Sequence, residues 1–231
     1  MRLMTRLSVI IPCLNEADAL PITLASLQRL REVGHEVVLV DAGSTDGSTD
    51  LAESLVDRII PSERGRAQQM NVGAAAATGD ALWFLHADTM VPVTAVDSLM
   101  RALAHGAVWG RFDVRLDAPG MAFRIIEWCM NQRSRLSGIA TGDQAIFVRR
   151  DAFETVGGFP LIPLMEDVAL SSALRRCSRP CCSRIRVRTS ARRWEQFGVL
   201  PTVLQMWHLR YRFWRGDDPR ELARLYRQGP R

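Results

Sequence analysis

Acidic side chains follow three short segments of this chain, each where a strand or loop is expected to give way to a turn or helix. The segments are VVLVDAGSTDG at 37–47, FLHADT at 84–89 and MED at 165–167. In an open α/β sheet the ligand crevice lies outside the carboxyl ends of the strands. Carboxylates at such a place accept hydrogen bonds, bind metal ions or take up a proton. We therefore expect the three segments to build one crevice.

The first of these turns, after a strand at 37–40, offers two kinds of carboxylate. Asp41, at the end of the strand, is suited to accept a hydrogen bond from the ring N–H of a nucleobase, and Gly43 lets a ligand approach the backbone closely. Asp46 is more typical of a helix cap or an Asx-turn. No G-x-G-x-x-G follows the first strand, which ends at Pro12, and this argues against a dinucleotide-dependent dehydrogenase.

Two arginines, Arg64 and Arg66, precede a predicted helix at 66–77. A helix N-terminus with flanking arginines suits phosphate, because free N–H groups, the helix dipole and bidentate guanidinium pairing all favour an anion. Gln69 and Asn71 lie in the first turns of this helix, within reach of a ribose or base. The small residues that follow, at 73–77, are expected to let the helix pack close to the sheet.

Glu166 and Asp167 come after a proline-bracketed loop at 157–163 and open a helix. Adjacent carboxylates at a helix start point in different directions, so one is expected to face the crevice while the other caps the helix or holds a loop. The positive end of the helix favours an ionised carboxylate there. Ordinary enrichment of acids in the first helical turn is the alternative explanation.

Strand and helix patterns alternate in the first part of the chain, which predicts βαβ units and a parallel sheet. Apolar runs predict strands at 7–11, 37–40, 58–60 and 81–85, and helical patterns lie at 17–31, 48–55, 66–77 and 93–104. The later part mixes predicted strands at 108–116 and 145–148 with helices at 119–136 and 166–176. We expect an α/β fold in one domain, 1–231, with a nucleotide-binding half (1–105), a second half (106–188) and a C-terminal helical arm (189–231).

Composition narrows the class of protein. The 231 residues are 47% hydrophobic, enough for a full core, and no run of 18 apolar residues predicts a membrane span. The segment 1–16 has some signal-peptide character, but its short apolar run breaks at a proline and acidic residues, so it is interpreted as a first buried strand. The five cysteines are odd in number and unevenly spaced, which is typical of a reducing cytosol.

Charge divides the chain into two parts. All 30 basic residues are arginine; residues 1–174 hold 15 of them against 21 acids, net −6, and residues 175–231 hold 15 against 4, net +11. The stretch MWHLRYRFWRG at 206–216 interleaves aromatics with arginine. Such a stretch packs as a helical arm or lies on an anionic membrane surface, whereas we expect no nucleic-acid partner.

Five motifs in the same order resemble family 2 glycosyltransferases of the GT-A fold. They are IIPCLNE, VDAGSTDG, GRAQQMNVGAAAATGD, FLHADT and GDQAIFVRR with the following GGFP and MEDVALSSALRR. The segment TSARRWEQFG is similar to a small bacterial subgroup labelled glycosyltransferase 2-like, and the likeness covers nearly the whole chain. The resemblance implies a Rossmann-like nucleotide-binding half fused to an acceptor half around a mixed, mostly parallel sheet.

The resemblance also implies roles for particular residues. Asp167 stands at the position of the general base that deprotonates an acceptor hydroxyl, with inversion at the anomeric carbon. His86 and Asp88 stand at the metal motif, which implies Mg²⁺ or Mn²⁺, although only one of the two is a carboxylate. The donor-binding positions are Pro12, Asn15, Glu16, Asp41, Gly43, Arg64, Arg66, Gln69, Asn71, Asp143, Gln144 and Glu166. Trp109 and Trp194 are candidate platforms for stacking against a sugar, although an aromatic side chain is more often simply part of the core.

The expected partners follow from this resemblance and from the basic arm. They are a nucleotide diphosphate-sugar donor and a hydroxyl acceptor, for which a lipid-linked molecule is one alternative. We expect a cytoplasmic protein, with contact at the inner membrane face and a homodimer left open. A nucleotidyltransferase and a non-catalytic nucleotide-sugar-binding protein are the two other functions that the residues allow.

Overall fold

Two of the predicted apolar runs form neighbouring parallel strands inside one sheet. Successive residues point to opposite faces of a strand, so Val9 and Ile11 pack on one side of the sheet and Ile10 on the other. This is a computed structural model that describes residues 6–230. Residues 1–5 of the segment with signal-peptide character lie outside the described residues, and the strand predicted at 7–11 is confirmed.

The sheet has eight strands in the order β3-β2-β1-β4-β7-β6-β8-β5. Their bounds are β1 (Leu7–Cys13), β2 (Glu36–Asp41), β3 (Arg58–Pro61), β4 (Ala81–Phe84), β5 (Thr89–Met90), β6 (Trp109–Leu116), β7 (Phe147–Arg149) and β8 (Cys181–Thr189). β1 to β4 pair in parallel, β7 runs antiparallel between β4 and β6, and β6 pairs in parallel with β8. The expected mixed sheet is therefore present.

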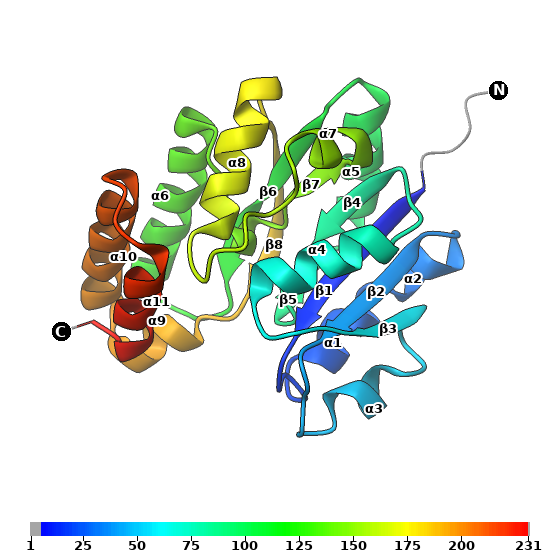
Figure 1. Cartoon of the computed structure of the whole chain (residues 1–231), viewed down its shortest axis with the longest axis horizontal. Helices are drawn as coiled ribbons and strands as arrows, with labels where there is room; N and C mark the ends of the chain where they lie inside the picture. The colour runs from blue at the N-terminus through cyan, green and yellow to red at the C-terminus, as the bar shows by residue number, and fades with distance from the viewer. Residues whose placement is uncertain (1–5, 231) are drawn as a thin grey trace.

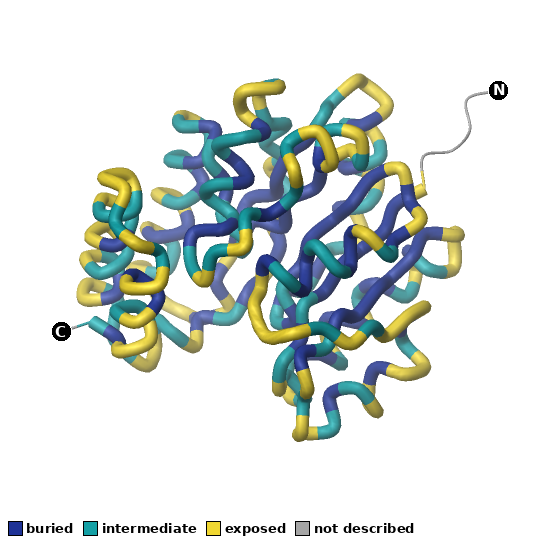
Figure 2. The backbone as a smooth tube through the Cα atoms, viewed as in Figure 1, coloured by how far each residue is buried: buried dark blue, intermediate teal, exposed yellow. Residues whose placement is uncertain are grey.

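Helices cover both faces of the sheet (Figure 1). One face packs against α1 (Leu20–Ala25), α2 (Gln28–Glu32), α3 (Ser48–Ala52) and α5 (Thr94–Ala104). The other packs against α4 (Arg66–Ala76), α7 (Arg150–Thr155) and α8 (Glu166–Cys177). Figure 2 shows β1, β2 and β4 as the most buried part of the tube, between helices that are partly exposed.

The remaining helices gather at one end of the sheet, beside α8, at the left of Figure 1. They are α6 (Met121–Ser137), α9 (Arg192–Phe197), α10 (Val199–Trp214) and α11 (Pro219–Gln228), and a short 3-10 turn, η1 (Gly142–Gln144), precedes β7. Apolar side chains of α6 pack against the start of α10, and α10 packs against α11. None of the helices described for residues 6–230 is long and apolar enough to cross a membrane.

One prediction of local structure was wrong, and one long strand was not predicted. The helix expected at 17–31 is two short helices, because Ser26 Oγ donates to Thr23 O and Gln28 Nε2 donates to Leu24 O, and such bonds compete with the helix ladder. β8 was not predicted at all, since its alternating arginines resemble a solvated segment. Its nine residues become a strand by pairing with β6 on one side and β5 on the other.

The prediction of close packing by α4 is confirmed at Gly73. A Cβ there would lie 2.5 Å from Ile10 Cγ2 and 2.8 Å from Val40 Cγ2, closer than real Cβ atoms approach. The helix can therefore lie directly on β1 and β2 only because this residue has no side chain. That close approach positions the N-terminus of α4, with Arg66, beside the carboxyl ends of the strands.

Candidate functional site

The loops that follow β1 and β2 are joined by side-chain hydrogen bonds. Asn15, which has a left-handed φ of 54°, accepts from the Thr45 N–H at 2.9 Å, and its own N–H donates to Ser44 Oγ at 2.9 Å. Asp41 accepts from the N–H groups of Gly43 and Ser44, at 2.9 and 3.0 Å. The sequence-predicted residues Asn15, Asp41 and Gly43 therefore meet in one interlocked turn, and Pro12 lies next to them on β1.

Asp46 also joins the loops that follow β1 and β2. Its Oδ1 accepts from the N–H and Oγ of Ser48, and its Oδ2 accepts from the Ala17 N–H at 2.9 Å. This Asx-turn is one of the two roles expected for Asp46 from sequence. The carboxylate is occupied by protein donors and is not part of the cavity described below.

Two other predicted donor residues use their amides to brace the backbone. Gln69 is buried and donates to Cys13 O at 2.8 Å and to Val40 O at 2.9 Å, which ties β1 to β2. Asn71 exchanges two hydrogen bonds with the backbone of Phe159. Both amides position the walls of the crevice. Neither residue lines the cavity near Asp167 that is described below.

A guanidinium from the C-terminal arm lies in the crevice between two acids. Arg192 Nη2 lies 2.9 Å from Glu16 Oε2 and 3.3 Å from Asp88 Oδ2. Asp88 Oδ1 also lies 3.4 Å from the hydroxyl of Thr189, at the end of β8. The structure thus brings together the end of β1, the turn after β4 and the start of α9, with one cationic group between two carboxylates.

A cavity of about 620 Å³ lies next to this crevice, between the strand ends and helices α6, α8 and α10. Five charged or titratable residues from four segments line one side of it: Arg66, His86, Asp143, Glu166 and Asp167. All five were predicted as site residues from sequence. A cavity of this size can hold part or all of a small-molecule ligand.

Asp167 is held rigidly at the start of α8. Its Oδ2 accepts from the Gly142 N–H at 2.7 Å and its Oδ1 from the Val168 N–H at 2.6 Å. Met165, two residues before Asp167, has a left-handed φ of 68°, which turns the chain sharply into the helix. A carboxylate has about four lone-pair positions, so Asp167 keeps acceptor capacity for a ligand after these two bonds.

The other two acids of the cavity have opposite pKa shifts. Burial raises the pKa of Glu166, Asp167 adds to the shift, and Arg66, whose Nη1 lies 3.6 Å from Glu166 Oε1, opposes it. Burial alone would raise the pKa of Asp143, but contact with His86 and the charges of Arg66 and Arg133 lower it. The site therefore keeps Asp143 ionised and makes the charged form of Glu166 costly.

His86 has one nitrogen engaged and one without a partner. Its Nδ1 lies 3.4 Å from Asp143 Oδ1, while the buried Nε2 has no hydrogen-bond partner among the described residues. Gly142 packs against the ring, because a Cβ there would lie 2.4 Å from Nε2. A buried unpaired nitrogen at a cavity wall is available to a ligand.

The donor set at Asp88 suits a divalent cation in one respect and not in another. Across residues 6–230, no group of three or more His, Cys, Asp or Glu side chains could hold a metal ion by itself. His86 faces Asp143, so it does not share a common metal-binding position with Asp88. However, Mg²⁺ is commonly held by one or two carboxylates plus substrate phosphates, and Arg192 demonstrates that a cation fits between Asp88 and Glu16. Asp88 fits a metal that a diphosphate helps to bind.

Three further predicted residues lie outside this arrangement. Gln144 is buried and closes a capping box with Thr141 in η1, which shapes the turn that carries Asp143. Arg64 is exposed on the loop before α4. Trp109 is fully buried in the core and donates to Ser178 O, so the interpretation of Trp109 as a sugar platform was wrong; Trp194 does line the cavity.

Sequence reasoning missed the far side of the cavity. Two arginines, Arg133 of α6 and Arg210 of α10, line it together with apolar side chains of both helices. The aromatic–basic pattern at 206–216 was the available signal for α10. Nothing in the sequence of α6 marked Arg133, because a single arginine on an amphipathic helix is most often a solvated residue.

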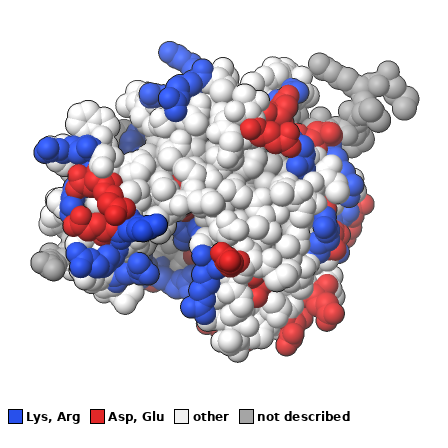
Figure 3. All heavy atoms as spheres, in the orientation of Figure 1, with Lys and Arg blue, Asp and Glu red and all other residues white. Residues whose placement is uncertain are grey.

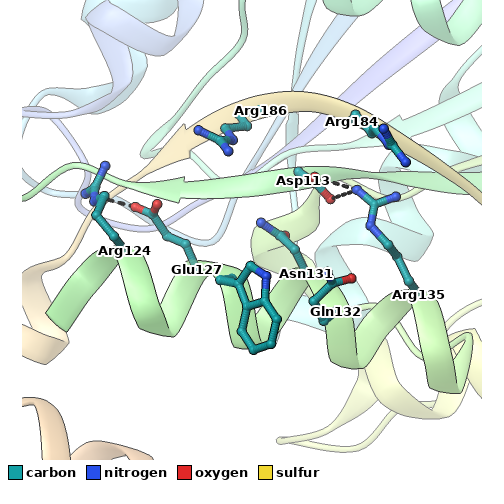
Figure 4. A pocket seen from close by; sticks show the side chains of 9 residues that line it. Asp113, Arg124, Glu127, Asn131, Gln132, Arg135, Arg184 and Arg186 are labelled. Atoms are coloured by element: carbon teal, nitrogen blue, oxygen red, sulfur yellow. Dashed lines mark hydrogen bonds and ion pairs between the residues drawn. The ribbon is translucent and has the colours of Figure 1, made fainter. Parts of the chain in front are cut away.

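A second hollow of about 440 Å³ lies between α6 and β8 (Figure 4). Both of its acids are paired: Asp113 with Arg111 and with Arg135, whose Nη2 lies 2.5 Å from Asp113 Oδ2, and Glu127 with Arg124 at 2.9 Å. None of the sequence-predicted site residues lines it. This hollow therefore contributes no group to the chemistry of Asp167.

Known proteins share both the sequence pattern and the fold. The family model of Glycosyl transferase family 2 matches residues 8–157. A PGL/p-HBAD biosynthesis glycosyltransferase of Mycobacterium bovis is 34% identical over 163 residues, which is 67% of this chain and 63% of that protein. A poly-beta-1,6-N-acetyl-D-glucosamine synthase of Staphylococcus aureus is 24% identical over 183 residues, 71% of this chain and 44% of that one. The chain thus spans less than two thirds of the length of these relatives.

Solved structures at low sequence identity confirm the GT-A fold. S. aureus TarS 1-349 in complex with UDP matches with a TM-score of 0.64 at 18% identity, covering 80% of this chain and 60% of that one. Glucosyl-3-phosphoglycerate synthase from Mycobacterium tuberculosis, in complex with Mn²⁺ and UDP-glucose, matches with a TM-score of 0.59 at 17% identity, covering 80% and 70%. With a family match over most of its sheet, the chain belongs to glycosyl transferase family 2.

Proposed function

We propose that this protein transfers a sugar from a UDP-sugar to an acceptor hydroxyl, with inversion at the anomeric carbon. The observation that carries the proposal is the rigid Asp167 carboxylate, held by two backbone N–H groups in a cavity beside the strand ends. UDP is the first choice of nucleotide because the similar TarS and synthase structures contain UDP or UDP-glucose. Family membership supports the reaction class.

Asp167 is proposed to act as the general base. The acceptor oxygen forms a bond to the anomeric carbon, the bond from that carbon to the diphosphate oxygen breaks, and the hydroxyl proton passes to Asp167. A base on the face opposite the leaving diphosphate leads to inversion. Glu166 is the poorer candidate, because its side chain is buried and Arg66 lies against it.

The nucleotide and phosphates are assigned to the crevice at the ends of β1, β2 and β4. Asn15 and Asp41 are proposed to contact the base and ribose, and Arg66, at the N-terminus of α4, to face the phosphates. Asp143 and His86 would orient the sugar, since His86 Nε2 has no protein partner among the described residues. A divalent metal, held by Asp88, would neutralise charge on the diphosphate.

A non-catalytic nucleotide-sugar-binding protein is the second candidate. The contact between Arg192 and Asp88 favours it, because the only carboxylate of the metal motif is already neutralised by a protein cation. In that case UDP-sugars would bind without being turned over. Turnover therefore separates the two functions.

The test has a binding step and a turnover step. UDP-, GDP- and dTDP-sugars are compared with Mn²⁺ by thermal shift, since a ligand that binds only the native state raises the melting temperature. For the nucleotide-sugar that binds, the rate of nucleotide release is then measured. Asp167→Asn should lower turnover by about 10²-fold or more, with donor binding near the wild-type value. Unchanged turnover in Asp167→Asn would remove this residue from the role of base.

A further inference from the structure

The cavity beside Asp167 is polar on one side and apolar on the other. The polar side holds the charged residues that the proposed reaction uses. The apolar side is built by α6 and α10, and its residues are Ala122, Ile125, Ile126, Cys129, Met130, Val199, Val203, Met206 and Trp207. A nucleotide-sugar has little apolar surface to bury there. The apolar side therefore points to a second, amphipathic ligand.

Two arginines in this cavity lack a counter-ion. In the cavity, Arg66 lies beside Glu166 and His86 beside Asp143. Arg133 and Arg210, in contrast, form no ion pair among the described residues. The buried Nε and Nη2 of Arg133 have no hydrogen-bond partner there either. Both side chains are half-buried. A cation partly removed from water without a counter-ion is costly, so a site that holds two such arginines suits an anion.

Their pKa values are consistent with this arrangement. Burial and the neighbouring charge of Arg210 lower the pKa of Arg133 to about 10, while Asp167 and Asp143 oppose the shift. Burial also lowers the pKa of Arg210, and Asp167 opposes it. Both guanidinium groups remain charged at neutral pH. Asp167, the proposed base, is the acid whose charge acts on both of them.

Exposed apolar side chains continue from the cavity onto the surface. On α10 they follow the spacing of one helix face: Leu200, Leu204, Trp207, Tyr211 and Trp214. On α6 they are Met121, Ile125 and Trp128. Ile125 and Trp207 belong both to these rows and to the cavity lining, so the apolar path runs from the cavity outward. A soluble surface rarely shows rows of large apolar residues without a partner.

We propose that the cavity takes its acceptor from a membrane, as an anionic lipid whose hydroxyl reaches Asp167. Its anionic group would lie between Arg133 and Arg210, and its apolar chain would leave along α6 and α10. This inference rests on the proposed function for the role of the hydroxyl. In the reaction, the lipid oxygen bonds to the anomeric carbon, the carbon–diphosphate bond breaks and the hydroxyl proton goes to Asp167.

A membrane fits the charge of this region better than a second copy of the chain does. Residues 175–231, which include Arg210, carry a net charge of +11, and Arg133 of α6 adds one more cation at the cavity. Two identical faces of this kind would repel each other, whereas an anionic bilayer attracts them. Figure 3 shows basic atoms beside the acidic cluster over α10 and α11.

The first test uses octyl phosphate as a soluble probe of the cavity. Trp194 and Trp207 line the cavity, so binding is followed by tryptophan fluorescence. Octyl phosphate should bind at least tenfold more tightly than either octanol or inorganic phosphate. Arg133→Gln and Arg210→Gln should each weaken it about tenfold, while Arg220→Gln, an exposed arginine of α11, should leave it unchanged. Equal affinity in all variants, or equal binding of octanol, overturns the proposal.

The second test asks whether the apolar rows meet a bilayer. Wild-type protein should sediment with vesicles that contain phosphatidylglycerol, less at high salt, and remain in solution with purely zwitterionic vesicles. Ile125→Ser should reduce sedimentation several-fold, and Ile22→Ser, equally exposed on α1, should not (57% and 54%). A protein that stays in solution at low salt, or a dimer that Ile125→Ser converts to monomer, overturns the membrane assignment.

These results are independent of the proposed function. UDP-sugar binding and nucleotide release test the glycosyltransferase reaction without any lipid. If UDP-sugars are turned over but octyl phosphate and anionic vesicles do not bind, the acceptor inference fails alone. If the lipid probes bind as expected but no nucleotide-sugar does, the proposed function fails.

Discussion

The guanidinium of Arg192 lies 3.3 Å from the carboxylate of Asp88, although 104 residues separate them in sequence, and the same Nη2 atom lies 2.9 Å from Glu16. Burial would lower the pKa of Arg192, but the two carboxylates raise it. This contact attaches the C-terminal arm to the ends of β1 and β4. It also places a positive charge where a divalent metal would bind a diphosphate.

Arg192→Gln should increase the affinity for Mn²⁺ in the presence of UDP. The guanidinium and the metal compete for Asp88, and a mostly exposed ion pair contributes about 0.2–1 kcal/mol, so the gain is expected to reach about fivefold. Titration calorimetry measures it. A loss of Mn²⁺ or UDP affinity in this variant would mean that Arg192 holds the diphosphate instead of competing with the metal.

Asp88→Asn should weaken metal-dependent binding of UDP far more than Asp46→Asn does. Asp88 is the carboxylate of the metal motif, whereas Asp46 is occupied by Ser48 and Ala17 in its own loop. The measurement is UDP affinity with Mn²⁺ and with EDTA for each variant. If wild-type affinity is the same under both conditions, no metal is used, and Arg66 and Arg192 carry the diphosphate charge.

Gly142→Ala should displace the His86 ring and lower turnover. The new Cβ would lie 2.4 Å from Nε2 and 2.7 Å from Cε1 of His86, and the shift would disturb the Gly142 N–H that donates to Asp167. Overpacking of this kind typically costs about 1–3 kcal/mol of unfolding free energy. The double variant Gly142→Ala with His86→Ala should recover part of that loss in urea unfolding. Additive losses would contradict the contact.

Glu166→Gln should make the protein more stable at neutral pH and leave its stability unchanged in acid. Because the folded-state pKa of Glu166 is raised above 4.5, the native state binds more protons than the unfolded state between the two values, and stability falls as pH rises through that window. The variant lacks this cost. The free energy of unfolding of both proteins is measured in urea from below pH 4.5 to neutral pH. The difference between the two free energies should grow with pH. A variant less stable at neutral pH would mean that the pair with Arg66 dominates.

The local pattern of residues was enough to predict the first half of the sheet and the position of its acids. The runs that became β1, β2 and β4 are apolar on both faces, as strands covered by helices must be, and this pattern is local. Asp41, Asp88 and Asp167 stand where strands or loops end, so a position near the carboxyl ends of the strands could be predicted for each of them. Five motifs in order are enough to indicate the family from the sequence.

Which of these side chains are available to a ligand depends on packing between distant segments. Gln69 was predicted to contact the donor, but its amide is used to join Cys13 to Val40, a choice set by the close packing of α4. β8 is a strand because β6 lies beside it, not because its own residues favour one.

The cations of the site were decided in the same way. Arg192 meets Asp88, and Arg133 and Arg210 share a cavity with Asp167, because α6, α9 and α10 fold back onto the end of the sheet. An arginine has the same local pattern whether it is solvated or faces an acid. Its partner is chosen by contacts between segments dozens of residues apart, and such contacts leave no periodic signal in the sequence.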